Sequence, residues 1–283
     1  MAPILSYHFV NGDTTVANNP LFLSDQITIL DQASSLIPGG AYTTFRTYPG
    51  VKALHLAGHF SRLENSCRLA GYPINLDEEQ LRSNLRKLLQ QYPGDVARVR
   101  VTIPFGRQPA EIYIFIAPLI VPNELQRTQG VKVITTHYQR VNPEAKVTSF
   151  IQATWDLRCS LPADIEEVIL VDENHAMLEG MTSNFYAVQG STIQTAGERV
   201  LPGITREIVL TAARKSGLEI DFTPPKLTDF SLFDEAFLTS SSRGVLPVTF
   251  IDGQPVGSGK PGGITRRLMA LYEQQVQAEI EPI

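Results

Sequence analysis

The stretch "LPGITREIVLTAARKSGLEI", from Leu201 to Ile220, opens with a Pro-Gly turn and continues as an amphipathic helix. Ile204, Ile208 and Ala212 recur at helical spacing, and Thr205 lies in the first turn. The first backbone N–H groups of such a helix have no partner inside it, and the helix dipole adds partial positive charge there. The stretch therefore predicts either an ordinary capped helix or a binding site for a phosphate-like anion.

The chain around this helix has the composition of an ordinary globular protein. It has 283 residues, of which 43% are hydrophobic and 19% charged, and a net charge of −5. This charge and the lack of any Lys/Arg block argue against a nucleic-acid partner. The start "MAPILSYHFVNGDTT" has no basic segment and no long apolar run, so we expect neither a signal peptide nor a membrane span. The two cysteines form no CxxC motif and are typical of a reduced compartment, so we expect a cytoplasmic protein.

Predicted helices and strands are mixed along the chain without strict alternation. This pattern favours an α+β or irregular α/β fold in two domains. Residues 121–130, "VPNELQRTQG", are polar and lack periodicity, so we expect an interdomain linker there. It would separate a smaller N-terminal α/β domain, residues 1–120, from a larger domain, residues 131–283, that contains the anion-site helix.

Two helices are predicted from clear apolar stripes. In "NLDEEQLRSNLRKLLQQYPG", Asp77 is the expected N-cap and leucines form the stripe. In "PEAKVTSFIQATWDLRCSL", Ile151, Trp155 and Cys159 recur at four-residue steps, which predicts one continuous helix.

Two further segments carry residues that a phosphorylated cofactor would need. "RVNPEAKVTSF" places Lys146 near a helix start, and "MLEGMTSNFYAV" places Glu179 at a strand end. Either side chain alone is most simply a solvated surface charge. Together with an anion site they indicate pyridoxal phosphate, which needs a lysine amine, an acid beside its pyridine nitrogen and donors for its phosphate.

The ordered motifs of the chain resemble those of a known enzyme family. "FVNG", "AYTTFR…HFSRLENS", "PEAK", "LEGMTSNFYAV", "LPGITRE" and "DEAFLTSSSRGVLPV" occur in the order found in the fold-type IV, class IV aminotransferases. That family includes branched-chain aminotransferases, D-amino acid aminotransferases and aminodeoxychorismate lyases. The resemblance implies a two-domain fold like that of the D-amino acid enzymes, pyridoxal 5'-phosphate as cofactor and a homodimer.

The resemblance also assigns roles to individual residues. Lys146 in "PEAK" matches the lysine that forms the Schiff base, and Glu179 matches the acid that faces the pyridine nitrogen. A carboxylate there would keep the ring protonated and able to accept electrons. Asn184 matches a structural residue after that acid. The expected phosphate donors are Arg62 in "HFSRL", Ile204, Thr205 and Ser241. Ser240 and Ser242 stay open as alternatives to Ser241, because the serine run permits a one-residue slip.

The substrate side departs from the family pattern. Tyr42 fits the aromatic residue that lines the pocket, but it begins "YTT" where "FET" or "FEG" is usual. This motif resembles the lyase branch. Arg100 in "RVRVTIPFG" matches a substrate-side arginine of some branched-chain enzymes, whereas "TIP" replaces the "TRG" of the D-amino acid enzymes. Arg243 in "SSSRG" is a second candidate for binding a substrate carboxylate.

Three functions follow as hypotheses. The first is an aminotransferase that acts on an amino acid, with branched-chain amino acids as candidates, and on a 2-oxo acid. The second is an aminodeoxychorismate lyase that releases pyruvate and p-aminobenzoate. The third is a non-catalytic anion-binding protein on an enzyme fold, in which Lys146 forms no Schiff base. The expected partners are small molecules and a second copy of the chain, with neither nucleic acid nor a membrane.

Overall fold

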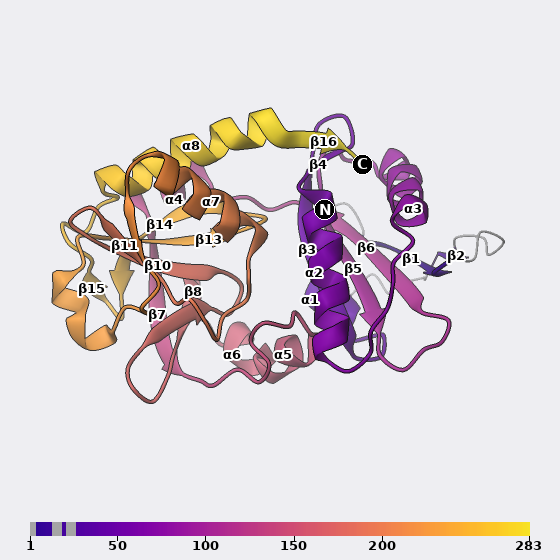
Figure 1. The fold of residues 1–283 in the computed structure, drawn as a ribbon, viewed down its shortest axis with the longest axis horizontal. Helices are drawn as coiled ribbons and strands as arrows, with labels where there is room; N and C mark the ends of the chain where they lie inside the picture. The colour runs from indigo at the N-terminus through magenta and orange to yellow at the C-terminus, as the bar shows by residue number, and fades with distance from the viewer. Residues whose placement is uncertain (1–3, 13–18, 21–26) are drawn as a thin grey trace. The chain divides into compact units, whose positions relative to one another are not determined.

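A computed structural model describes residues 4–12, 19–20 and 27–283, which form two compact units (Figure 1). The first unit contains Met1–Ile120, Ala145–Trp155 and Glu279–Ile283, and the second contains Val121–Glu144 and Asp156–Ala278. This division differs from the expected one in two ways. The segment predicted as a linker contains α4 (Glu124–Gln129) within the second unit, and Lys146 falls in the first unit.

The first unit is built on a seven-stranded sheet with the strand order β16-β4-β3-β5-β6-β1-β2. Its neighbouring strands are antiparallel. Its strands are β1 (Leu5–Val10), β2 (Asn19–Pro20), β3 (Gly40–Tyr48), β4 (Lys52–Leu54), β5 (Ala97–Pro104), β6 (Glu111–Pro118) and β16 (Ile280–Pro282). Its helices are α1 (Leu30–Ser34), α2 (Leu56–Leu69), α3 (Glu78–Gln91) and α5 (Thr148–Ala153).

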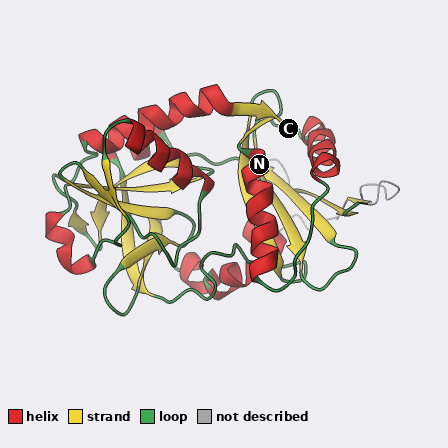
Figure 2. Ribbon diagram, viewed as in Figure 1, coloured by secondary structure: helices red, strands yellow, loops and turns green. Residues whose placement is uncertain are grey.

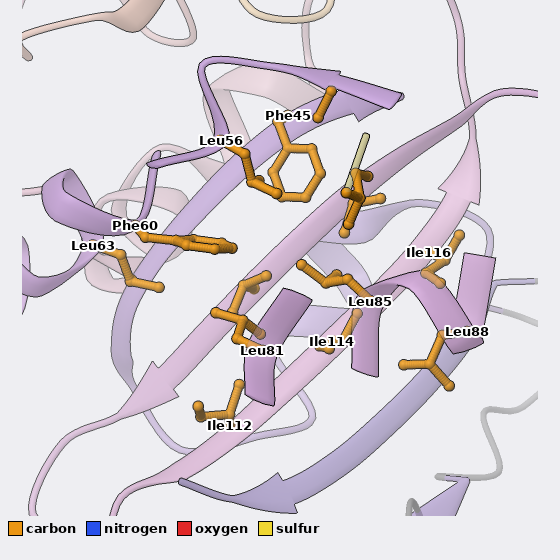
Figure 3. Packing of buried hydrophobic residues seen from close by; sticks show 14 of the residues in the cluster. Phe45, Leu56, Phe60, Leu63, Leu81, Leu85, Leu88, Ile112, Ile114 and Ile116 are labelled. Carbon is orange, nitrogen blue, oxygen red and sulfur yellow. The ribbon is translucent and has the colours of Figure 1, made fainter. Parts of the chain in front are cut away.

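One face of this sheet packs against α2 and α3 (Figure 3). Phe60 of α2 and Leu85 of α3 are fully buried with Phe45 and Ile114 of the sheet. Each such side chain contributes about 1.5–3 kcal/mol by leaving water. The expected start of α3 is confirmed, because Asp77 accepts a hydrogen bond from the backbone of Gln80 at 2.9 Å. This packing holds α2, which carries Arg62, rigidly against β3.

The second unit contains a nine-stranded sheet in which β10, β13, β14, β7, β8 and β9 form a closed ring, because β9 pairs with β10 as well as with β8. Figure 2 shows its strands in yellow and its helices in red. The strands are β7 (Val131–His137), β8 (Ile165–Val171), β9 (Met177–Gly180), β10 (Asn184–Gln189), β11 (Thr192–Gln194), β12 (Glu219–Asp221), β13 (Glu235–Ser240), β14 (Gly244–Ile251) and β15 (Gln254–Pro255). Besides α4, the remaining helices are α6 (Trp155–Cys159), α7 (Ile204–Lys215), the 3₁₀ helix η1 (Leu227–Leu232) and α8 (Gly263–Glu279).

The mixed α/β fold is the one expected from the sequence, but one predicted helix is broken. The segment with the stripe Ile151, Trp155 and Cys159 forms two short helices, α5 and α6, instead of one. The break lies at Thr154, whose hydroxyl donates to the carbonyl of Phe150 at 2.7 Å. Such a bond from a threonine back to the preceding turn competes with regular helix geometry. Within the described residues, no helix is both long and apolar enough to cross a bilayer.

Candidate active site

Lys146 lies just before α5 and is anchored by its backbone. Its N–H donates to Oγ of Ser66 on α2 at 3.1 Å, and its carbonyl accepts the N–H of Tyr42 on β3 at 2.9 Å. Its amine, Nζ, lies 4.9 Å from the centre of the Tyr42 ring, within the range of a cation–π contact. The sheet and α2 therefore fix the backbone of this lysine and leave its amine against an aromatic surface.

Arg62 lies in the same unit, buried on α2, and contacts two polar side chains. Its Nη2 donates to Oγ1 of Thr43 at 3.2 Å and lies 3.4 Å from Nδ1 of His59. The Thr43 hydroxyl, which accepts from Arg62, is also 2.9 Å from Nδ1 of His59. Burial first, and then the charges of Arg62, Lys146 and His55, lower the pKa of His59 well below its ordinary value. The ring is therefore neutral at pH 7. Because Nδ1 also faces the N–H donors of Arg62, we assign Nδ1 as the unprotonated nitrogen, which accepts the Thr43 hydroxyl.

Sequence reasoning missed His59 as part of this cluster. The signal was present, because His59 lies three residues before Arg62 and residues at this spacing share one face of a helix. Thr43 was noticed only as a departure from the family pattern. In the structure its hydroxyl connects His59 to Arg62.

Arg100 belongs to β5 and is held by protein groups. It is buried at 2% exposure, and its guanidinium carbon lies 4.7 Å from the centre of the Tyr42 ring. Its acceptors are Leu30 O at 3.0 Å, Ser34 Oγ at 2.7 Å, Asp31 Oδ1 at 2.7 Å and Thr44 Oγ1 at 3.3 Å. This differs from the substrate contact that the sequence predicts, because the carboxylate of Asp31 already neutralises Arg100. The arginine instead ties α1 to the sheet and lies against Tyr42.

In the second unit, Glu179 is the penultimate residue of β9, and both oxygens of its buried carboxylate accept hydrogen bonds. Its Oε1 lies 2.8 Å from Nη1 of Arg140, and its Oε2 accepts the backbone N–H of Leu201 at 3.0 Å. Its side chain is 3% exposed and that of Arg140 is 7% exposed. Hydrogen bonds to ionised groups of this kind are shorter and stronger than neutral ones. The acid is therefore held in one orientation, next to the segment that leads into α7.

The approach to α7 is fixed by Asn184. Its Nδ2 donates to the carbonyl of Leu201 at 2.9 Å, which gives the structural role expected of this asparagine. A Cβ atom at Gly203 would overlap Oδ1 of Asn184, so only glycine fits there. Since Gly203, the N-cap residue, has no side chain that could cap the helix, the first turn of α7 at Ile204 and Thr205 keeps the character of an anion site.

Ser241 lies in the loop between β13 and β14, and Arg243 closes that loop. Arg243 Nη1 pairs with Glu166 at 3.0 Å, and Nη2 pairs with Glu167 at 2.9 Å. Arg243 is a candidate from the sequence for binding a substrate carboxylate or for an ordinary surface arginine, and in the structure its guanidinium group pairs with these two protein carboxylates. Glu167 was not singled out from the sequence, because nothing in its local pattern distinguishes it from a surface acid.

The structure thus brings the predicted site residues together in two groups, one in each unit. The first group is Lys146, Tyr42, Arg62 and Arg100, and the second is Glu179, Ile204, Thr205, Ser241 and Arg243. Among the described residues, no three or more His, Cys, Asp and Glu side chains gather in a way that could hold a metal ion.

Residues 40–251 match the model of one protein family, amino-transferase class IV. The chain belongs to this family. This class IV aminotransferase is 26% identical over 253 residues to a D-alanine aminotransferase of Bacillus licheniformis, covering 85% of the chain and 88% of that relative. It is 22% identical over 262 residues to a branched-chain-amino-acid aminotransferase of Pseudomonas aeruginosa, covering 86% of the chain and 85% of that relative.

Solved structures show the same fold. The T.th. branched-chain amino acid aminotransferase with pyridoxamine 5'-phosphate superposes with a TM-score of 0.78 at 21% identity, and 97% of each chain is covered. A branched-chain aminotransferase of Thermoproteus uzoniensis with norvaline gives a TM-score of 0.76 at 18% identity, covering 98% of this chain and 99% of that one. The fold-type IV architecture expected from the sequence is confirmed.

The enzyme is a pyridoxal-phosphate-dependent aminotransferase, and its residues fit that cofactor. The cofactor requires an amine, an acid for its ring and donors for a dianionic phosphate. The first unit offers the amine of Lys146 and the cation of Arg62. The second offers the buried acid Glu179 and the N-terminus of α7, which follows Gly203.

Proposed function

We propose that this enzyme transfers an amino group between an amino acid, with branched-chain amino acids as candidates, and a 2-oxo acid, with Lys146 as its catalytic residue. The observation that carries the proposal is the bond from Leu201 N–H to Oε2 of Glu179, because it joins the acid to the helix that would bind phosphate. When bound, pyridoxal phosphate supplies a carbonyl for the amino group and a ring that accepts electrons.

Lys146 would act as both the anchor and the proton carrier. Its Nζ would hold the cofactor through the carbonyl carbon until the substrate's amino group took its place, and the freed amine would then be the base that carries the proton of the substrate's α-carbon. The Tyr42 ring beside Nζ would limit water around the amine. The backbone bonds of Lys146 to Ser66 and Tyr42 support this role, because they fix the position from which the side chain extends.

The remaining predicted residues would bind and orient the cofactor. Arg62 would supply a full positive charge to the phosphate, and Ile204, Thr205 and Ser241 would supply N–H and hydroxyl donors. Glu179 would hold the pyridine nitrogen in its protonated form. Arg140 would fix the rotamer of that acid through the ion pair at 2.8 Å.

The lyase alternative drew its support from the "YTT" motif. In the structure Thr43 bonds His59 and Arg62, and Thr44 accepts from Arg100. Both hydroxyls thus have partners in the protein, so these contacts give the motif a positioning role and do not by themselves favour the lyase.

The test is a panel of half-reactions with the purified enzyme. Single amino donors, including both enantiomers of alanine, valine and leucine, are added to the cofactor-loaded protein, and the loss of the cofactor's visible absorbance is followed. Amino-group transfer predicts this loss, and its recovery on adding a 2-oxo acid. Release of pyruvate and p-aminobenzoate from aminodeoxychorismate, with no half-reaction, would establish the lyase instead. A protein with no visible absorbance after loading would contradict both activities.

We also propose that the enzyme is a cytoplasmic homodimer, as the family resemblance implies. Light scattering on the purified chain gives its mass directly. A mass near 31.3 kDa, that of one chain, would contradict the dimer.

A further inference from the structure

Glu167 on β8 is a buried acid that contacts two loops of the second unit. Its Oε2 accepts from Nη2 of Arg243 at 2.9 Å, from the N–H and hydroxyl of Thr182 at 3.1 and 2.5 Å, and from the hydroxyl of Ser183 at 3.0 Å. Its Oε1 accepts the N–H of Val168 at 3.1 Å. Five donors on one carboxylate compensate the cost of burying it.

Close packing makes this arrangement sensitive to small changes. A Cβ atom at Gly180 would overlap Oγ of Ser183 and lie 2.8 Å from Cγ of Glu167. The glycine that follows Glu179 is thus required so that the turn can close over Glu167. The turn at residues 181–183 connects Glu179 to Asn184, which holds Leu201 before α7. The turn that Glu167 holds is therefore bounded by both residues.

Arg243 connects the same acid to the Ser241 loop. Its Nε donates to Oγ of Ser240 at 3.1 Å, so the residue before Ser241 is hydrogen-bonded to the arginine two positions after it. Burial alone would raise the pKa of Glu167, but Arg243, with Thr182, holds that pKa below its ordinary value. Glu167 and Glu166 in turn overcome the effect of burial and raise the pKa of Arg243. Both partners are therefore charged at neutral pH.

We propose that Glu167 and Arg243 are positioning residues that fix the 181–183 turn and the 240–242 loop together, and thereby set the phosphate donor Ser241 relative to the acid Glu179. This inference rests on the proposed function, because it assigns those two residues to one cofactor. It gives the pair a role in cofactor affinity besides its role in the fold. The proposal predicts a selective effect: loss of the pair should weaken the binding of a ligand that carries the phosphate and have little effect on the binding of one that lacks it.

Two variants test the pair. Arg243→Lys keeps the charge but loses the planar fork that reaches Glu166, Glu167 and Ser240 together. The double variant Glu167→Gln/Arg243→Met removes both charges of the buried pair at once, and the carboxylate that then lacks its arginine is Glu166, which is 23% exposed. Arg127→Lys is the matched control, because Arg127 pairs with Glu273 in the same unit but at a more exposed position.

Cofactor-free full-length enzyme is titrated with pyridoxal phosphate and, separately, with pyridoxal. In both test variants we expect affinity for pyridoxal phosphate to fall roughly tenfold or more, the effect of losing one hydrogen bond to a charged group. Affinity for pyridoxal should stay close to that of wild type, since pyridoxal has no phosphate for Ser241 to bind. The control variant should match wild type with both ligands.

Thermal unfolding of the same cofactor-free proteins distinguishes a positioning role of the pair in phosphate binding from a purely structural role. If the test variants unfold at lower temperature but keep the wild-type ratio of the two affinities, the pair is only structural and the proposal is wrong. If wild type binds neither ligand, the proposed function has failed instead. Arg243→Lys should lie between wild type and the double variant in its affinity ratio, and the reverse order would also contradict the proposal.

Discussion

Oε2 of Glu179 lies 3.0 Å from the backbone nitrogen of Leu201, so one buried carboxylate supports the segment that leads into α7. Its other oxygen pairs with Arg140 at 2.8 Å. The acid proposed to face the cofactor ring and the helix proposed to bind its phosphate are therefore one connected structure. A change at Glu179 should affect both ends of the cofactor.

Glu179→Gln separates these two effects. A glutamine oxygen can still accept from Leu201, so cofactor should still bind, but the ring loses its charged partner. Since a buried ionic neighbour shifts a pKa by about one to three units, the half-reaction should slow by about tenfold to a thousandfold. Stopped-flow absorbance measures this rate. Glu179→Ala also loses the Leu201 contact and should weaken cofactor binding further, and an unchanged half-reaction rate in Glu179→Gln would place the ring acid elsewhere.

Lys146→Ala should abolish turnover and leave the fold intact. The bonds that anchor this segment use the backbone N–H and carbonyl of Lys146, not its amine. We therefore expect the unfolding temperature of the variant to remain close to that of wild type, while the visible absorbance of the bound cofactor is lost. Normal turnover in the purified variant would refute the catalytic assignment.

Thr43→Val tests the hydroxyl that joins His59 to Arg62. Valine keeps the branched shape but leaves the buried Nδ1 of His59 without its 2.9 Å partner. Nδ1 keeps its longer contact with Nη2 of Arg62 at 3.4 Å. The loss of one hydrogen bond costs about 0.5–1.5 kcal/mol, so urea unfolding should show a loss of that size. Arg62 would also lose its 3.2 Å contact, and affinity for pyridoxal phosphate should fall several-fold. Thr43→Ser restores the hydroxyl and should recover both properties. Equal stability of the valine and serine variants would argue against this network.

The pKa of His59 predicts how stability depends on pH. Burial and the nearby charges of Arg62, Lys146 and His55 place this pKa well below that of the unfolded chain. Between the two values the unfolded chain binds the extra proton, so stability rises with pH there and is lost on acidification. Cofactor-free enzyme should lose up to about 1.4 kcal/mol per pH unit from this histidine below about pH 6.5. His59→Gln should remove that contribution, because its oxygen accepts from Thr43 without titrating. Urea unfolding at several pH values measures both slopes, and identical slopes would exclude His59 as the source.

The sequence predicted those features that depend on residues close together along the chain. The N-cap at Asp77 and the α7 start at Ile204 are local, since capping and helical periodicity act over one or two turns. The same is true of Gly203, whose place before the helix was read directly from "LPGITRE". The order of such local motifs along the chain was enough to indicate the family.

The partners of Arg100 and Arg243 could not be predicted in this way. Asp31 lies 69 residues from Arg100, and Glu167 lies 76 residues from Arg243. A lone arginine on a strand or in a loop has the same local pattern whether it meets a substrate or a protein carboxylate. Only the tertiary packing shows which charges come together: it places Asp31 of α1 against Arg100 of β5, and Glu167 of β8 against Arg243.

The N-terminus of α7 gives the last prediction, which concerns the order of two effects. Thr205→Val keeps the size and branching of a side chain that is 3% exposed, and it leaves the backbone N–H groups of the helix in place. One hydrogen bond to a charged phosphate contributes about 1.5–3 kcal/mol, so affinity for pyridoxal phosphate should fall about tenfold to a hundredfold. Arg62→Ala removes a full charge as well as its donors and should weaken binding more. Titration of cofactor-free wild type and both variants gives the order, with thermal unfolding as the check that each variant is folded. If Thr205→Val binds as tightly as wild type, the hydroxyl serves only the helix, and "LPGITRE" binds phosphate through its backbone or not at all.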